Sequence, residues 1–136
     1  MSAILKKFEK LGLKDNMSIV HSARRGINPS VFYSFAQTAN ITEKKLAEII
    51  HLHPRTLRNY AASQKKLDPV ESEHLLKLIA LFGKGEAVFG NVDQFNEWLL
   101  EEIPVMREKP ISMLNTPGGT DIISEELDKL SHGYVI

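Results

Sequence analysis

Cysteine is absent from this chain of 136 residues, which excludes a disulfide framework and a cysteine-based zinc site. Long apolar runs are also missing, because no segment approaches the roughly 18 consecutive apolar residues that span a bilayer. The first residues lack the apolar segment of a signal peptide. Apolar residues still make up 43% of the chain, enough for a modest hydrophobic core. Together these features predict a globular protein of the cytoplasm.

Net charge is zero overall, because 17 Lys and Arg balance 17 Asp and Glu. The distribution is uneven: residues 1–66 hold 12 basic and 4 acidic residues, a net +8, and residues 67–136 hold 5 and 13, a net −8. A basic half can neutralise phosphates and release their counterions, whereas an acidic half is repelled by DNA. The pattern therefore predicts two surfaces for two different partners, with chance unevenness as the alternative.

Strand signals are scarce as well, since no segment alternates β-branched and polar residues. Helix starts are frequent: Asn28-Pro29 and Asp68-Pro69 each place a capping side chain before a proline, and Glu71 completes a capping box with Asp68. Residues 75–82 are apolar on nearly every side, as in a buried central helix joining two halves. The predicted fold is all-α, with helices at about 2–11, 17–25, 29–39, 42–50, 54–63, 69–82, 84–89, 92–102 and 121–131.

Segment 103–120 contains three prolines and two glycines, so it cannot form one helix. It is either an ordered loop that packs over the core or a linker, and its apolar residues favour packing. We expect the last helix to start just after Gly118-Gly119-Thr120, with Gly133 as a left-handed residue beyond its end. The predicted division is an N-terminal helical region at 1–68 and a second helical domain with a C-terminal tail at 69–136.

Residues 42–60 have the layout of a helix-turn-helix, with Thr42 able to cap the first helix. His51 occupies the turn position where glycine is common, although histidine tolerates a left-handed backbone better than most residues. His53 is a poorer cap for the second helix than serine or threonine. The residues expected to face inward are Leu46, Ala47, Ile50 and Leu52 from the first helix and the turn, and Leu57, Tyr60 and Ala61 from the second helix.

The second helix presents polar side chains on its outward side. A major groove accepts one helix whose side chains reach base edges; Arg55 and Arg58 can pair with guanine, and Asn59 can pair with adenine. Lysines near the two helices can contact phosphates. A helical hairpin with a solvated basic face is the alternative. The predicted DNA-binding residues are Lys44, Lys45, Arg55, Thr56, Arg58, Asn59, Lys65 and Lys66.

Patterns for catalysis or for cofactor binding are missing from the sequence. Gly83-Lys84-Gly85 lacks the length of a phosphate-binding loop, and adjacent carboxylates on a helix point in different directions. The five histidines lack metal-ligand spacing and are expected at the surface or in turns. We therefore expect no catalytic residue, no metal site and no cofactor, and a protein that is not an enzyme.

Four segments of the second half, residues 75–90, 95–100, 109–119 and 122–133, carry a family resemblance in the order in which they occur. The strongest pieces are the Pro-Ile-x-x-Leu-x-Thr sequence that starts at Pro110, the glycine before the last helix, and the Leu-x-x-Leu-x-x-Gly sequence that ends at Gly133. With the helix-turn-helix, they make the chain resemble the Xre/MbcA/ParS antitoxins from residue 42 onward. The Pro117-Gly118-Gly119 turn departs from the simpler Gly-Ala pair common in that family.

This resemblance implies the antitoxin of a type II toxin–antitoxin system, a repressor that binds its own operator and neutralises a cognate RES-domain toxin. RES toxins are similar to ADP-ribosyltransferases and consume NAD⁺, an activity that the antitoxin itself lacks. A single helix-turn-helix buries little DNA, so we expect a homodimer that reads two half-sites within a larger toxin–antitoxin complex.

The last helix and the tail are the expected toxin contact, blocking the active site of the toxin. Apolar residues are unusual at a terminus, where solvated residues are the norm, and an aromatic anchor is a common binding hot spot. Acidic residues on the helix can meet a basic cleft and speed encounter. A tail that folds back on its own core is the alternative. The predicted toxin-binding residues are Glu125, Glu126, Lys129, Leu130, Gly133, Tyr134, Val135 and Ile136.

Two other functions remain open from the sequence. One is a stand-alone transcription regulator that senses a small ligand through its second half, which requires a concave apolar pocket with convergent polar groups. The other is a structural adaptor whose basic half binds an acidic protein rather than DNA.

Overall fold

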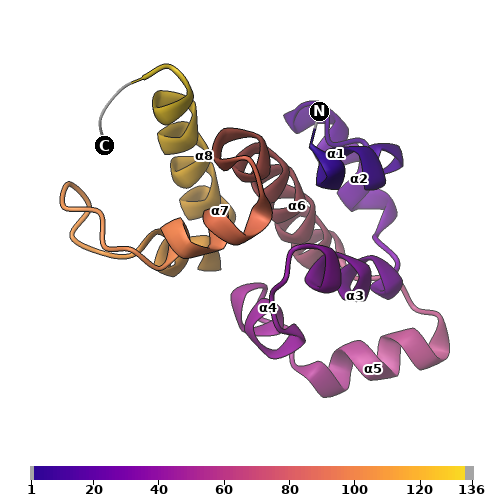
Figure 1. Ribbon diagram of the computed structural model, residues 1–136. Coiled ribbons are helices and arrows are strands. Elements are labelled where there is room, and N and C mark those ends of the chain that lie inside the picture. Colours follow the sequence, from indigo (N-terminus) through magenta and orange to yellow (C-terminus); the bar gives the residue numbers. More distant parts are fainter. Residues whose placement is uncertain (1, 134–136) are drawn as a thin grey trace.

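The computed structural model describes residues 2–133, and these residues fold into helices without a β-strand, as the sequence predicts (Figure 1). Within these residues, β-type pairing is limited to one isolated antiparallel bridge between Ile103 and Glu108. The elements are α1 (Ala3–Lys7), η1 (Glu9–Leu11), α2 (Asn16–Arg25), α3 (Pro29–Thr38), α4 (Glu43–Ile49), α5 (Pro54–Ser63), α6 (Pro69–Phe89), α7 (Val92–Leu99), η2 (Pro110–Asn115) and α8 (Pro117–Ser131), where η denotes a 3-10 helix.

Helix α6 is the centre of the fold, as its apolar sequence predicts. It packs against α1 and α2 on one side and against α7 and α8 on the other (Figure 1). Edge-to-face aromatic pairs run through the core from Phe35 to Phe82 and on to Phe95, with ring centroids 5.4 and 4.9 Å apart. Because Phe35 belongs to α3 and Phe95 to α7, this core is continuous between the two halves of the chain. The division at residues 68 and 69 stays a prediction.

The predicted break of this helix at Gly83 is wrong, since α6 continues without interruption to Phe89. Gly83 and Gly85 mark close approaches of neighbouring elements instead. A Cβ added at Gly83 would lie 2.4 Å from Cγ of Leu5, and one added at Gly85 would lie 2.4 Å from Cγ of Phe95. A glycine inside a helix costs only about 1 kcal/mol relative to alanine, which close packing at both positions can offset.

The start of α6 also differs from its predicted capping box. The Asp68 side chain makes no capping hydrogen bond to the residues that the structure describes, although Pro69 occupies the first turn as expected. The buried Ser72 side chain instead ties the first turn to its surroundings, because its Oγ donates to the Leu67 carbonyl (3.1 Å) and accepts from the Ile27 amide (3.0 Å). This hydrogen bonding joins the end of α2 to the start of α6.

Segment 103–120 is ordered and packs over the core, which settles the choice between a packed loop and a linker. Its residues 110–115 form η2, and Leu114 is fully buried. The last helix begins at Pro117 rather than at residue 121, because Oγ1 of Thr116 accepts a hydrogen bond from the Gly119 amide (3.0 Å) and caps the helix. Gly118 and Gly119 therefore lie inside the first turn of α8. Gly133 follows the helix with φ 81°, the predicted left-handed residue.

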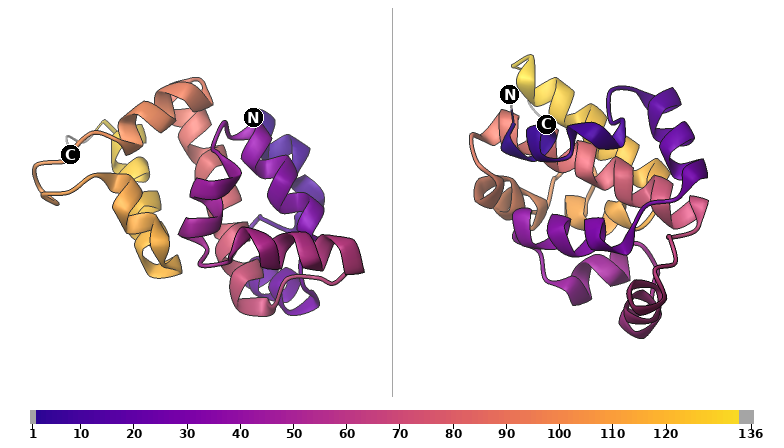
Figure 2. Two further views of the ribbon diagram at one scale, coloured as in Figure 1. Left: turned by 90° about the horizontal axis from the view of Figure 1, so that it is seen from below. Right: turned by 90° about the vertical axis from the view of Figure 1, so that its right-hand side faces the viewer.

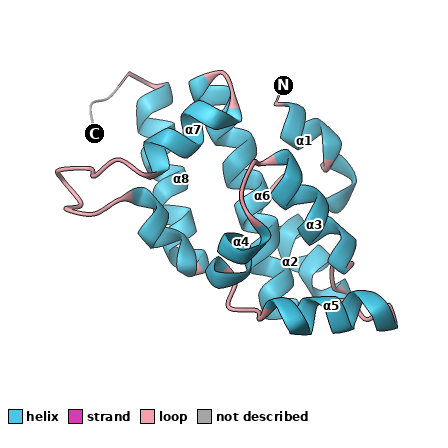
Figure 3. Cartoon of the chain, turned by 60° about the horizontal axis from the view of Figure 1, so that its bottom comes forward, coloured by secondary structure: helices cyan, strands magenta, loops and turns pink. Residues whose placement is uncertain are grey.

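Helices α6 and α8 run in the same direction. Nζ of Lys77 lies 2.9 Å from Oδ2 of Asp121, and Nζ of Lys84 lies 2.9 Å from Oδ1 of Asp128. From the first pair to the second, the residue number rises by seven on both helices, as it does when neighbouring helices run parallel. Figures 2 and 3 show that α8 and α5 lie toward opposite ends of the molecule. Within residues 2–133, none of the helices combines the length and the hydropathy needed to cross a membrane.

Candidate nucleic-acid interface and protein-binding surface

Helices α4 and α5 and the turn between them form the predicted helix-turn-helix. Thr42 caps α4, its Oγ1 accepting from the Lys45 amide at 3.0 Å. His51 adopts a left-handed backbone with φ 59°. His53 is a better cap than the sequence suggests, because Nδ1 of its ring accepts a hydrogen bond from the Arg55 amide at 3.0 Å. The N-terminus of each helix is therefore capped by a side chain from this segment.

The inward face of this unit is mostly as predicted, with one exception. Leu46, Ala47 and Ile50 are buried, and Leu57 is the buried residue of α5. Tyr60 is half-buried, but Ala61 is exposed and does not face the core. The inner face of α5 is narrow because the helix packs mainly against α3 and α4 and leaves the rest of its surface to solvent.

The outward face of α5 is available to a partner. Arg55, Arg58 and Asn59 are exposed, and their side chains make no hydrogen bond or ion pair with residues 2–133. Thr56 is half-buried at the edge of the face. A recognition helix requires this combination of a fixed backbone and polar side chains that are not already bound within the protein.

The four predicted lysines lie near α5 and differ in whether their side chains already contact another residue. Nζ of Lys45 lies 3.8 Å from the Glu48 carboxylate in an exposed pair, which adds little stability and breaks readily. Nζ of Lys65 lies 4.4 Å from the centre of the Tyr60 ring and donates to its hydroxyl at 3.3 Å. Lys44 and Lys66 are exposed. Lys65 is therefore held on α5, and the other three extend from the helix-turn-helix into solvent.

Two basic residues adjoin this cluster that the sequence reasoning missed. Arg24 and Arg25 are exposed at the end of α2, and a Cβ added to the next residue, Gly26, would lie 3.0 Å from Cβ of Lys66. The Leu67 amide fixes this proximity by donating to the Ile27 carbonyl at 2.9 Å. The high charge of residues 1–66 included both arginines, but only tertiary contacts place the end of α2 beside Lys66, and there the Arg25 guanidinium donates to Oγ of Ser22 at 3.2 Å.

Two histidines join the helix-turn-helix to the second half of the chain. His51 is 2.7 Å from the Asn115 carbonyl, and His74 is 2.7 Å from the Leu114 carbonyl, both through Nε2. These bonds satisfy carbonyls at the end of η2, which lack partners within that short helix. His74 is buried on α6, contrary to the expectation that all histidines lie at the surface or in turns. Burial lowers its pKa, although its hydrogen bond to Leu114 acts in the opposite direction.

The predicted protein-binding surface lies on α8. Ile123 and Leu127 face the core, whereas Glu125 and Lys129 are exposed. Glu126 and Leu130 are half-buried, and Gly133 lies exposed beyond the helix. Three further predicted residues, Tyr134, Val135 and Ile136, lie outside the described residues.

The expected acidic character of α8 is reduced by ion pairs. Asp128 is held by Lys84, and Glu126 lies 3.2 Å from Nζ of Lys129. Of the three carboxylates at 125, 126 and 128, Glu125 alone has no ion pair with the residues described. A partner that approaches α8 therefore meets Glu125 as the acidic group most available for a new contact.

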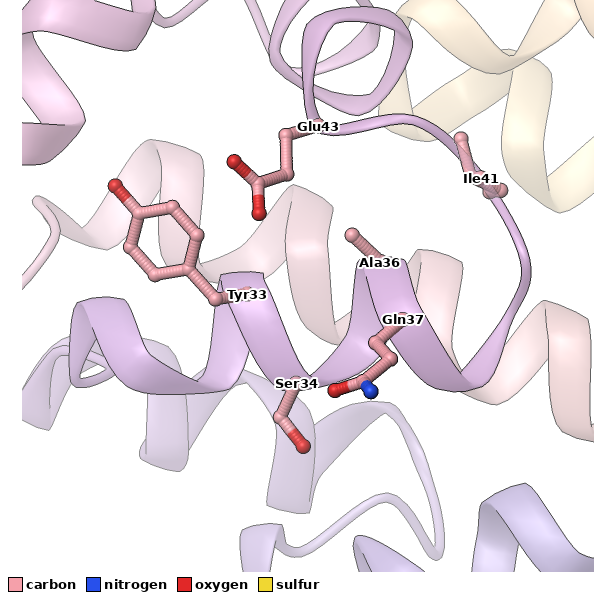
Figure 4. Close-up of a pocket in the computed structure, with 6 residues that line it drawn as sticks. All are labelled: Tyr33, Ser34, Ala36, Gln37, Ile41 and Glu43. Atoms are coloured by element: carbon pink, nitrogen blue, oxygen red, sulfur yellow. The ribbon is translucent and has the colours of Figure 1, made fainter.

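A hollow of about 730 Å³ lies between α3 and the start of α4, lined by side chains that include Tyr33, Ala36 and Ile41 (Figure 4). Figure 4 shows the Glu43 carboxylate on one side of α3, with Ser34 and Gln37 pointing away from it. Polar groups that diverge in this way do not fix the orientation of one small ligand. The hollow also belongs to the first half of the chain, whereas a ligand-sensing regulator was expected to use the second half.

The folded chain is a helix-turn-helix protein of the DNA-binding class, with a second helical unit joined to it through α6. Residues 18–80 match the antitoxin Xre-like helix-turn-helix domain, and residues 84–133 match the antitoxin Xre/MbcA/ParS C-terminal toxin-binding domain. The chain belongs to the Xre/MbcA/ParS family of antitoxins. Its partners are therefore DNA for the first unit and a toxin for the second. Comparison with curated proteins found no significant match.

Proposed function

We propose that this antitoxin neutralises a RES-domain, NAD-consuming toxin and represses its own operon by binding operator DNA. The observation that carries the proposal is the separation of two surfaces of different chemistry. Helix α5, whose exposed side chains are basic, and helix α8 lie toward opposite ends of the molecule (Figures 1 and 3). Because the surfaces do not overlap, one molecule can hold DNA and toxin at the same time.

On the DNA side, α5 enters the major groove, where Arg55 and Arg58 pair with guanine and Asn59 pairs with adenine. Thr56 lies at the edge of this contact. Lysines and arginines around the helix contact phosphates and position it without reading sequence. Two copies of the chain, related by a two-fold axis, read two half-sites of one operator. The phosphate-contacting residues are Lys44, Lys45, Lys65, Lys66, Arg24 and Arg25.

On the toxin side, α8 and the tail that follows Gly133 cover the active site of the toxin. Glu125 meets the basic, anion-binding cleft that a nucleotide-consuming enzyme needs, and Tyr134 supplies an aromatic anchor. Glu126, Lys129 and Leu130 support this contact along the same helix. The antitoxin acts in the cytoplasm by occupying the cleft, with no chemistry of its own.

Two measurements test the proposal. In the first, the purified chain is mixed with a labelled DNA fragment from upstream of its own gene. In the second, the chain is co-expressed with the protein that the adjacent gene encodes. We expect a specific gel shift, a stable complex of the two proteins, and growth rescue of cells that express the toxin. The proposal is contradicted if the chain does not bind this promoter and neither forms a complex with the adjacent gene product nor relieves its toxicity.

A further inference from the structure

Residues 101–109 form an ordered hairpin that projects from the second half of the chain, on the side away from α5 (Figures 1 and 3, and the left view of Figure 2). The Ile103 amide donates to the Glu108 carbonyl at 3.1 Å. The Ile103 carbonyl accepts from the amides of Met106 (3.0 Å) and Arg107 (2.8 Å), and Arg107 takes the left-handed conformation with φ 57°. Buried Ile103 anchors the base. Its hydrogen bonds define one turn geometry for the tip.

Val105 is an exposed apolar side chain of this turn, next to exposed Pro104 and near exposed Arg107. It is 81% exposed, more than any other large apolar side chain in residues 2–133. A single exposed apolar residue is common on protein surfaces and needs no partner. Val105 differs because its backbone is already fixed, so that a partner can bury it with little further loss of conformational freedom.

The surroundings of Val105 indicate the kind of partner. The hairpin lies within residues 84–133, the segment that matches the toxin-binding domain. That segment holds four Lys or Arg against ten Asp or Glu, a net charge of −6. The hairpin itself carries Glu101, Glu102 and Glu108 against Arg107 and Lys109, so the negative charge belongs mainly to the rest of the segment. An apolar tip on a segment of net negative charge complements an apolar depression on a partner of net positive charge.

We propose that the 101–109 hairpin is a second toxin-binding arm, separate from α8 and its tail; this inference rests on the proposed function. Val105 inserts into a shallow apolar depression outside the active site of the toxin, and the hairpin carboxylates meet basic residues around it. Figures 1 and 3 show the hairpin and the C-terminal end of α8 on the same side of the molecule. One toxin can therefore touch both elements, and the arm adds affinity that does not depend on the active site.

The test is titration calorimetry of the full chain with the purified protein encoded by the adjacent toxin gene. We expect Val105→Asp to weaken binding about tenfold or more, because it places a charge in an apolar contact. Val105→Leu keeps the apolar tip and should retain affinity. Val70→Asp is the matched control, since Val70 is 75% exposed on the first turn of α6 and the same change there should leave affinity unaltered.

Three outcomes overturn this inference. If the Val105→Asp variant binds the toxin as tightly as the unmodified chain, the tip is not in the interface. Equal losses for Val105→Asp and Val70→Asp show a general effect of added charge. Sedimentation of the chain alone is measured in parallel. If Val105→Asp changes its oligomeric state and leaves toxin affinity intact, the tip contacts a second copy of the chain. Failure of the unmodified chain to bind the toxin contradicts the proposed function itself.

Discussion

At the scale of single residues, the exposed face of α5 separates two kinds of basic side chain. Arg55 and Arg58 have no partner among residues 2–133, whereas Lys65 is held against the Tyr60 ring. An arginine that is not already bound can align its planar donor groups with a guanine edge. A lysine contributes a point charge and suits phosphate. In the proposed DNA complex, α5 therefore recognises bases through its arginines and contacts phosphate through Lys65.

Substitution of Arg58 by alanine should cost about 1–3 kcal/mol in operator binding and relax base preference, because a bidentate base contact is lost. Arg55→Ala should behave in the same way. Gel shifts with operator and random DNA at one salt concentration measure both quantities. Lys44→Ala is the control, and it should weaken binding to both DNAs alike. Equal losses on operator and random DNA for the two arginine variants would remove the base-reading role.

His74 should make the stability of the fold depend on pH. Burial holds the pKa of His74 below its ordinary value of 6.5, so the folded chain takes up a proton less readily than the unfolded chain does. At neutral pH the fold therefore has its full free energy of unfolding with respect to this group. Below about pH 6.5 that free energy falls, until the pH reaches the lower pKa of His74 in the folded state. Urea unfolding between about pH 7.5 and 5.5 measures the free energy of unfolding across this window.

His74→Gln should flatten this dependence, because glutamine can still donate to Leu114 but does not titrate. His21→Gln, at an exposed histidine of α2, is the control and should keep the slope of the unmodified chain. An unchanged slope in His74→Gln would assign the pH dependence to other groups.

At the scale of elements, the corner between η2 and α8 determines where the last helix points. Thr116 caps α8, and the first turn passes so close to η2 that a Cβ on Gly119 would lie 1.8 Å from the Met113 carbonyl oxygen. His51 and His74 hold the other side of the corner through the Leu114 and Asn115 carbonyls. The direction of α8 thus depends on contacts with both α6 and the turn of the helix-turn-helix.

Gly119→Ala should destabilise the fold by about 1–3 kcal/mol or more, because the added methyl group meets backbone that has little room to move. Gly118→Ala is the matched control, since nothing lies within 4 Å of a Cβ added at Gly118. There the substitution should be neutral or raise stability by up to about 1 kcal/mol. Urea unfolding of the two variants measures the difference, and equal stabilities would show that η2 and α8 are not in close contact.

At the scale of the whole molecule, the central helix α6 carries the two proposed binding surfaces on elements that lie toward different ends. The proposed DNA-binding surface comprises α5 and the end of α2, and the proposed toxin-binding surface comprises α8 and the 101–109 hairpin. Because the aromatic core from Phe35 to Phe95 joins the halves, they fold together while their exposed faces stay independent. Damage to one surface should therefore leave the other working.

A chain truncated after Leu130 should lose toxin neutralisation and keep operator binding. The truncation removes the end of α8 and the tail, but it leaves α2 to α7 and the buried residues Ile123 and Leu127 in place. Growth rescue measures the first function, gel shift the second, and circular dichroism the fold. Full neutralisation by the truncated chain would show that the tail does not block the toxin.

The sequence by itself determined the features that depend on local order along the chain. The caps at Thr42 and Asn28, the left-handed turn at His51 and the apolar run of residues 75–82 fix an all-helical fold with a helix-turn-helix. Each follows from a side chain and its near neighbours, so each can be read from spacing. The order of motifs in the second half gave the family in the same way.

Tertiary structure alone decided what depends on distant residues meeting. The glycines at 83, 85 and 119 weaken a helix in isolation, yet each lies inside one, because Leu5, Phe95 and Met113 approach them from other elements. The contact of Gly26 with Lys66 brings the end of α2, with Arg24 and Arg25, beside the helix-turn-helix. The buried His74 bonds to the Leu114 carbonyl of η2, forty residues away in the chain. Such positions carry no local signal, since their energetics depend on packing partners far away in the chain.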